Sequence, residues 1–135
     1  MAFVPPTGVE TTVARGLLPA TVPHADAAAN SGRAALLVAA MASQPEHLLA
    51  ATRDWLHQEY RKPAMPRSAE LMTQLRSSGL AAVISGAGPT VLVLGSEKTL
   101  DDATAGGWVA AAEGFGIRRG RVGGGARVVT SRTEE

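Results

Sequence analysis

The 135-residue sequence contains no cysteine and few aromatic residues. The lack of cysteine excludes disulfides, thiolate metal sites and thiol nucleophiles. It also fits a reducing compartment, so we expect a cytoplasmic protein. Aromatic residues make up 4% of the chain and hydrophobic residues 45%, so the core must consist mainly of Ala, Leu and Val.

The chain also lacks a strong net charge and a long apolar run. Its 13 basic and 12 acidic side chains give a net charge of +1, which argues against a general nucleic-acid binder. No window reaches the roughly 18 apolar residues that a membrane span requires. The segment from Met1 to Pro6 has no basic region followed by an apolar one. We therefore expect neither a signal peptide nor a membrane partner.

Patterns of metal ligands and of hydrolytic nucleophiles are also missing. No two of His24, His47 and His57 have metal-ligand spacing, so we expect no metal. His57 is near enough to Arg61 to line a site, but the pattern favours a solvated helix position. Ser85 lacks the Gly-x-Ser-x-Gly setting of a serine nucleophile. We assign no catalytic residue from these patterns.

Hydrophobic periodicity and turn residues predict an α+β fold with helices packed on one face of a mainly antiparallel sheet. We expect a strand end at Phe3-Val4, a short helix from Thr11 or Thr12 to Leu18, and further helices over residues 26–42, 45–61, 67–78 and 99–114. The expected later strands cover residues 81–84, 91–94, 117–122 and 126–129.

The length fits one domain over residues 1–135. We expect residues 1–8 to end a strand whose partners lie in an absent N-terminal domain, because the strand stops within its first few residues. Residues 130–135 are expected to form a flexible tail. The block from Leu36 to Val38 is apolar nearly all round its helix, which predicts a central position for that helix.

Two short apolar runs flank a tight loop, which we call the glycine loop: Ser85-Gly86-Ala87-Gly88-Pro89-Thr90. Its two glycines allow positive φ and close backbone approach. It is not a Walker loop, because no Lys-Ser/Thr follows, and it is not a dinucleotide fingerprint, because no helix opens after it. A plain hairpin turn and a contact with phosphate both remain open on spacing alone.

Arginines are the other candidate site residues. Arg61 is expected near a helix end, just before Pro63, where it either complements the helix dipole or presents a planar fork to a carboxylate. From Arg118 onward the chain carries five arginines and two glutamates. This cluster is either a solvated tail or an anion site.

Taken together, these motifs resemble the C-terminal half of the bacterial homoserine kinases, within the kinase superfamily named for galactose, homoserine, mevalonate and phosphomevalonate (GHMP). The resemblance extends to about Val129, and only its last stretch is superfamily-wide. The matching stretches are Thr12-Val-Ala-Arg15 with Leu18-Pro19, Asp26 with Asn30 and Arg33 to Leu37, Leu56 to Arg61 with Pro63 and Met65-Pro66, and the glycine loop.

The resemblance implies ATP-dependent phosphorylation of the L-homoserine hydroxyl, a step of threonine biosynthesis, with ATP and Mg²⁺ as cofactors of the complete enzyme. It implies that Arg61 binds the substrate carboxylate, and that a late arginine, Arg119 or else Arg121, assists. It implies that residues Ser85 to Thr90 support the nucleotide phosphate loop. These binding and supporting roles fit phosphoryl transfer, in which catalysis depends mainly on positioning the reacting groups.

The chain departs from these kinases in lacking their Gly-Leu-Gly-Ser-Ser phosphate loop and the N-terminal segment that binds homoserine's amino end. We therefore expect no tight cofactor binding and little activity from this chain alone, and we expect the N-terminal kinase half as a partner. One alternative is a non-catalytic module that binds an amino acid or a partner chain, and that partner could be a second copy of this chain in a homodimer. Another alternative is a different member of the superfamily.

Overall fold

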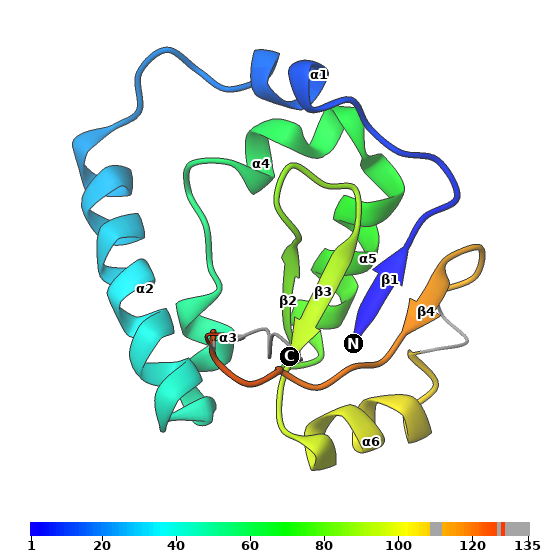
Figure 1. The fold of residues 1–135 in the computed structure, drawn as a ribbon. Coiled ribbons are helices and arrows are strands. Elements are labelled where there is room, and N and C mark those ends of the chain that lie inside the picture. The colour runs from blue at the N-terminus through cyan, green and yellow to red at the C-terminus, as the bar shows by residue number, and fades with distance from the viewer. Residues whose placement is uncertain (109–111, 127, 129–135) are drawn as a thin grey trace, which may run out of the picture.

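The computed structural model describes residues 1–108, 112–126 and 128. Four strands form one antiparallel sheet in the order β2-β3-β1-β4 (Figure 1). The strands are β1 (Ala2–Val4), β2 (Ala81–Ile84), β3 (Val91–Leu94) and β4 (Gly116–Arg118). The helices are α1 (Thr11–Gly16), α2 (His24–Ala42), α3 (Leu48–Ala51), α4 (Gln58–Arg61), α5 (Pro66–Ser77) and α6 (Glu97–Ala105), with 3₁₀ turns at Pro45–His47 and Lys62–Ala64.

The main core lies between one face of the sheet and helices α5 and α6. Phe3, Val91 and Val93 point to this face and are almost completely buried. Leu71, Met72 and Leu75 follow helical spacing on α5, which lies behind the sheet in Figure 1. Leu100 and Ala103 of α6 complete the cluster. The α+β fold class, with helices packed on an antiparallel sheet, is confirmed.

A second, smaller cluster joins α2 and α3 to the sheet. It contains Ala81 and Leu94, which alternate with the residues of the main core and so point to the other sheet face. Leu48 and Ala51 of α3 and Ala40 of α2 pack against them. Helices α2 and α3 therefore hold the chain beside strand β2, where the candidate site lies.

The prediction of a central α2 was wrong. Ala40 is its one fully buried residue, and Val38 is 72% exposed. The helix packs along one stripe against α3 rather than inside the core, so its outer apolar side chains face solvent. Within the described residues, no helix combines the length and the apolarity that a bilayer crossing requires.

The expected helix over residues 45–61 is interrupted after Ala51 and resumes only at Gln58. The Thr52 hydroxyl donates to Leu48 O at 2.7 Å, and the Asp54 carboxylate accepts amide hydrogen bonds from the following residues. Side chains of this kind compete with the helical backbone and favour helix ends. His47 and His57 are therefore not on one helix.

Helix α5 ends as predicted, at Gly79, which has φ +84°. The amide of Leu80 donates to Leu75 O at 3.1 Å and that of Gly79 to Arg76 O at 3.0 Å. This is a Schellman motif, and the apolar pair Leu75 and Leu80 is buried beneath it. The turn directs the chain straight into β2.

Three expected boundaries in the second half differ from the structure. Helix α6 begins after Ser96, whose hydroxyl accepts from Thr99 N at 3.2 Å, so Thr99 is not the cap. It ends at Ala105, where Gly106 and Gly107 form a turn with φ +84° at Gly107, and Trp108 is helical again, so the glycines interrupt the expected helix. Strand β4 ends at Arg118, because β1 offers it three residues to pair with. Of the strand expected at 126–129, residues 127 and 129 lie outside the described residues, as does the tail 130–135, and Ala126 and Val128 are in no strand.

Residues 1–8 also differ from expectation. Strand β1 is an inner strand that pairs with β3 on one side and β4 on the other. Its partners therefore lie within this chain and not in another domain. This pairing could not be predicted from the order of the sequence, because β3 and β4 both follow β1 by about 90 residues or more.

Candidate functional site

Arg61 lies in a small cavity of about 310 Å³ at the glycine-loop end of β2. We call it the arginine pocket, because Arg15 and Arg61 both line it, together with His57 and residues Gly86 and Ala87 of the glycine loop. Arg15 is at the end of α1 and Arg61 at the end of α4. Two guanidinium groups on one cavity make a site for an anion, and their planar forks suit a carboxylate.

The Arg61 side chain contacts the glycine loop directly. Its Nη1 donates to Gly86 O at 3.1 Å, while its Nε is buried and has no hydrogen-bond partner within the described residues. Pro63 stands just after α4 and shapes the 3₁₀ turn that ends the helix. Arg61 therefore links α4 to the glycine loop and keeps unused hydrogen-bond donors.

The glycine loop is a closed turn. Ser85 N donates to Thr90 O at 2.8 Å and Gly88 N to Ser85 O at 3.0 Å. Gly86 and Gly88 have φ of +60° and +92°, a conformation that glycine adopts without strain. No hydrogen bond of the described residues involves the amides of Gly86 or Ala87. Those two N–H groups are available to a phosphate oxygen or to a neighbouring loop.

Asp54 organises the turn before α4. Its carboxylate accepts from the amides of Leu56, His57 and Gln58, at 3.2, 2.9 and 2.6 Å, and from the His57 ring at 3.0 Å. Burial alone would raise the pKa of this carboxyl, but the four hydrogen bonds together outweigh burial and lower it. The ionised carboxylate therefore holds the first turn of α4.

We expect Asp54→Asn to lower the free energy of unfolding at neutral pH by about 1 kcal/mol, as for loss of a helix cap. Because folding lowers the Asp54 pKa, its stabilisation is complete above the ordinary aspartate pKa of about 3.9 and is lost as pH falls through the folded value. Urea unfolding of both proteins between about pH 7 and pH 3 measures this. A stability difference that stays constant over that range would contradict the assignment.

Two long-range hydrogen bonds hold the same segment against the rest of the fold. Asn30 Oδ1 on α2 accepts from Trp55 N at 3.1 Å. Gln58 Oε1 accepts from Ile84 N at 2.6 Å, an outward amide of the edge strand β2. The matching stretches of the sequence therefore meet in space, and together they place Arg61 beside the glycine loop.

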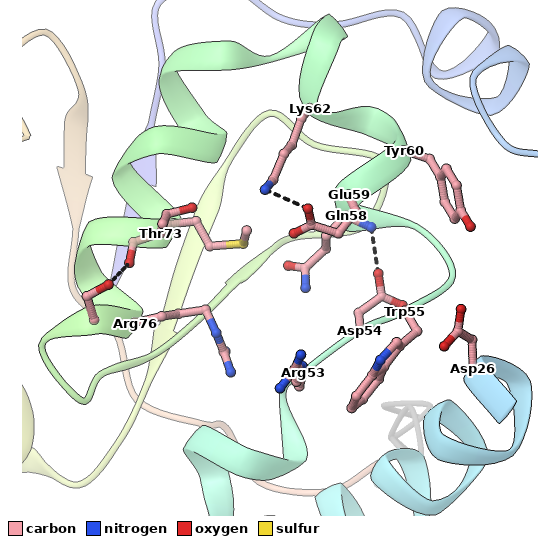
Figure 2. Close-up of a pocket in the computed structure, with 12 residues that line it drawn as sticks. Asp26, Arg53, Asp54, Trp55, Gln58, Glu59, Tyr60, Lys62, Thr73 and Arg76 are labelled. Carbon is pink, nitrogen blue, oxygen red and sulfur yellow. Dashed lines mark hydrogen bonds and ion pairs between the residues drawn. The ribbon is translucent and has the colours of Figure 1, made fainter.

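A second cavity of about 720 Å³ shares Asp54 and Gln58 with the arginine pocket (Figure 2). The guanidinium of Arg53 lies 4.7 Å from the centre of the Trp55 ring, a cation–π contact. Arg76 points into this region and donates to backbone carbonyls on α3 and β2. This cavity carries charges of both signs and supports the segment that leads to Arg61.

Arg119 is not brought together with Arg61. Arg118 pairs with Ala2 near the end of the sheet where β3 finishes at Leu94, whereas the glycine loop lies at the opposite end. Arg119 lines a separate cavity of about 1270 Å³ there and donates to Asp101 at 2.6 Å. Arg121 pairs with Glu97 on the same helix. Asp101 and Glu97 both belong to α6, so both late arginines lie against that helix.

The residue that the sequence interpretation missed is Arg15. It ends the stretch Thr12-Val-Ala-Arg15, which carried part of the resemblance but received no role. The sequence motif therefore already included Arg15, although no local feature of the sequence shows that α1 ends beside α4. Among the described residues, no group of three His, Asp or Glu side chains is placed to hold a metal ion.

Comparisons with known proteins agree on one family. The family model described as "GHMP kinases C terminal" matches residues 27–112, more than half of the chain. Homoserine kinase from Streptomyces avermitilis is 62% identical over 75% of this chain, and that from Clavibacter michiganensis is 55% identical over 72%. The matches cover 33% and 31% of those proteins, so the chain spans about one third of their length.

The fold comparison gives the same result. The crystal structure of homoserine kinase from Cytophaga hutchinsonii superposes with a TM-score of 0.69 at 22% identity, covering 85% of this chain and 38% of that one. This likeness supports the fold. The family-model match over residues 27–112 shows that the chain belongs to the GHMP kinase C-terminal family.

Proposed function

We propose that this chain is the C-terminal part of a homoserine kinase, which phosphorylates the hydroxyl of L-homoserine with ATP. The observation that carries the proposal is the arginine pocket, which Arg15 and Arg61 both line beside the glycine loop. Relatives at 62% and 55% identity are named homoserine kinase, which supports this substrate over that of another superfamily member.

In this proposal Arg15 and Arg61 hold the substrate carboxylate. Two guanidinium forks offer parallel hydrogen bonds to both carboxylate oxygens, and so fix the orientation of a small amino acid. Arg15 replaces Arg119 as the assisting arginine, because Arg119 lies at the opposite end of the sheet.

The proposed role of residues Ser85 to Thr90 is to support a phosphate loop supplied by the remainder of the enzyme. The free amides of Gly86 and Ala87 fit such a contact. The sequence holds no Gly-Leu-Gly-Ser-Ser run to cradle a triphosphate, so the described residues fit a supporting contact with ATP and not its main site. ATP supplies the transferred phosphoryl group when bound.

Substrate binding tests the carboxylate site directly. We expect L-homoserine at millimolar concentration to raise the melting temperature of this chain, since a ligand that binds the folded state stabilises it. Arg61→Ala and Arg15→Ala should each weaken binding by roughly 30-fold, about 2 kcal/mol, because each removes half of the charged clamp. Arg119→Ala is the matched control and should leave binding unchanged. Equal losses from Arg15→Ala and Arg119→Ala would contradict the assignment.

Under this proposal, homoserine kinase activity requires the N-terminal portion of the enzyme in addition to this chain. In a coupled ADP-release assay with ATP and L-homoserine, we expect no turnover by the 135-residue chain alone. Adding the separately expressed N-terminal two-thirds of the Streptomyces avermitilis relative should restore turnover. Robust turnover by the chain alone would refute the proposed division of the ATP site.

The alternative, a carboxylate-binding module without catalysis, is favoured by one observation: both arginines of the pocket belong to this chain. The same experiment separates the two functions. Homoserine binding with no activity after addition of the N-terminal portion would favour the module.

A further inference from the structure

His57 lines the arginine pocket, yet carboxylate binding by Arg15 and Arg61 gives it no task. The sequence interpretation favoured a solvated helix position over a site residue for His57. Its side chain is 46% exposed, and its ring is held in place instead of being free to rotate. A polar ring that is fixed at the rim of a cavity is available to contact whatever the cavity binds.

The contact with Asp54 sets which ring nitrogen is free. His57 Nδ1 lies 3.0 Å from Asp54 Oδ1, and the Asp54 side chain is 20% exposed. An ionised carboxylate can only accept hydrogen bonds, so Nδ1 carries the proton and donates. Nε2 is then the nitrogen presented away from Asp54, and no hydrogen bond of the described residues involves it. A carboxylate that orients a histidine in this way is a common device for presenting the other nitrogen.

Spacing indicates which group of an amino acid reaches Nε2. Arg61 N donates to His57 O at 3.1 Å, so one helical turn separates the two residues. Side chains one turn apart are about 5–6 Å apart at Cβ. In homoserine three carbon atoms separate the carboxylate from the hydroxyl, which gives an extended span of roughly 5 Å from carbon–carbon bonds of about 1.5 Å. Because Arg61 and His57 line the same cavity, a ligand of this length with its carboxylate on Arg61 can place its hydroxyl at His57.

A hydroxyl also suits Nε2 chemically. It both donates and accepts, so it pairs with Nε2 in the neutral ring, where that nitrogen accepts, and in the imidazolium, where it donates. An ammonium group can only donate and a carboxylate can only accept. The side-chain hydroxyl is therefore the group of the substrate that matches the ring in either state.

We propose that His57, oriented by Asp54, is a specificity residue whose Nε2 hydrogen-bonds the side-chain hydroxyl of an amino acid held by Arg15 and Arg61. This inference rests on the proposed function. It predicts that the site distinguishes a γ-hydroxylated amino acid from an isostere that lacks the hydroxyl, because a polar group left without its partner lowers affinity.

Calorimetric titration of the chain with L-homoserine and with L-norvaline tests this inference. Norvaline carries a methyl group in place of the hydroxyl and keeps the carboxylate and amino groups. We expect the wild-type chain to bind L-homoserine about 10-fold more tightly than L-norvaline, the effect of one hydrogen bond to a fixed partner. His57→Ala should abolish that preference by weakening homoserine binding alone. His57→Gln, which retains a side-chain hydrogen-bonding group, should restore part of it.

Controls separate this inference from the proposed function. Arg61→Ala should weaken binding of both ligands equally, since both carry the carboxylate. Glu59→Gln, on the same short helix with a 62% exposed side chain, should change neither. Equal wild-type affinity for the two ligands, or an unchanged preference in His57→Ala, would overturn the role of His57 while leaving the carboxylate site standing. Failure of the wild-type chain to bind either ligand would overturn both.

Discussion

Arg76→Met is expected to lower the free energy of unfolding by about 3 kcal/mol, because it leaves several carbonyls without a donor in a partly buried site. Arg76 Nη1 donates to Thr52 Oγ1 at 2.9 Å and to Ala82 O at 2.8 Å, and Nη2 donates to Leu49 O at 2.7 Å. The side chain thus closes the end of α3 and covers an outward carbonyl of the edge strand β2. Burial, and then the charge of Arg53, lower its pKa, but an arginine stays protonated throughout the physiological range.

Urea unfolding of three variants measures this effect. Arg76→Lys should recover part of the loss, because an ammonium offers donors without the planar fork. Arg67→Met is the control on the same helix. Among the described residues Arg67 donates one hydrogen bond, to Glu113 O at 2.8 Å and at an exposed position, so we expect a loss of at most about 1 kcal/mol. Similar losses for Arg67→Met and Arg76→Met would show that Arg76 has no special role.

Gly88→Ala is expected to destabilise the fold by about 2–3 kcal/mol, combining backbone strain with crowding. Gly88 has φ +92°, and a Cβ placed there would lie 2.6 Å from Met65 Cε and 3.0 Å from Ile84 Cγ2. Met65 is 4% exposed, so its side chain has little room to withdraw. The substitution therefore forces the glycine loop away from the turn that follows Arg61.

Gly86→Ala provides the matched comparison. Gly86 has φ +60°, and nothing lies within 4 Å of its added Cβ. Only the backbone strain remains, so we expect a loss of about 1 kcal/mol. Thermal unfolding of both variants, with homoserine binding as a second readout, tests the difference. A Gly88→Ala protein as stable as Gly86→Ala would mean that Met65 can move aside at little cost.

Features set by neighbouring residues could be predicted from the sequence. The hairpin β2–β3 with its glycine loop, and the end of α5 at Gly79, depend on turn residues within a few positions. The α+β class follows from the same local patterns. The boundaries of α6 were predicted less well, because Ser96 and Thr99 are both suitable caps and only the packed helix distinguishes them.

The candidate site was predictable in part. Arg61 and the glycine loop stood out as motifs, and the structure places them in contact through Gly86 O. The partner of Arg61 was not predictable, because Arg15 reaches it only through the path of the chain from α1 to α4. The proximity of Arg61 and His57 was visible in the sequence, whereas the orientation of the ring by Asp54 was not.

The sequence by itself determined the family, the local turns and the residue types available for chemistry, because motifs and turn preferences act over a few residues. Only the tertiary structure decided where helix 45–61 breaks, which sheet end each arginine occupies and which side chains meet. Those outcomes depend on contacts between distant segments, such as Asn30 with Trp55 and Gln58 with Ile84. No local preference of either partner contains that information.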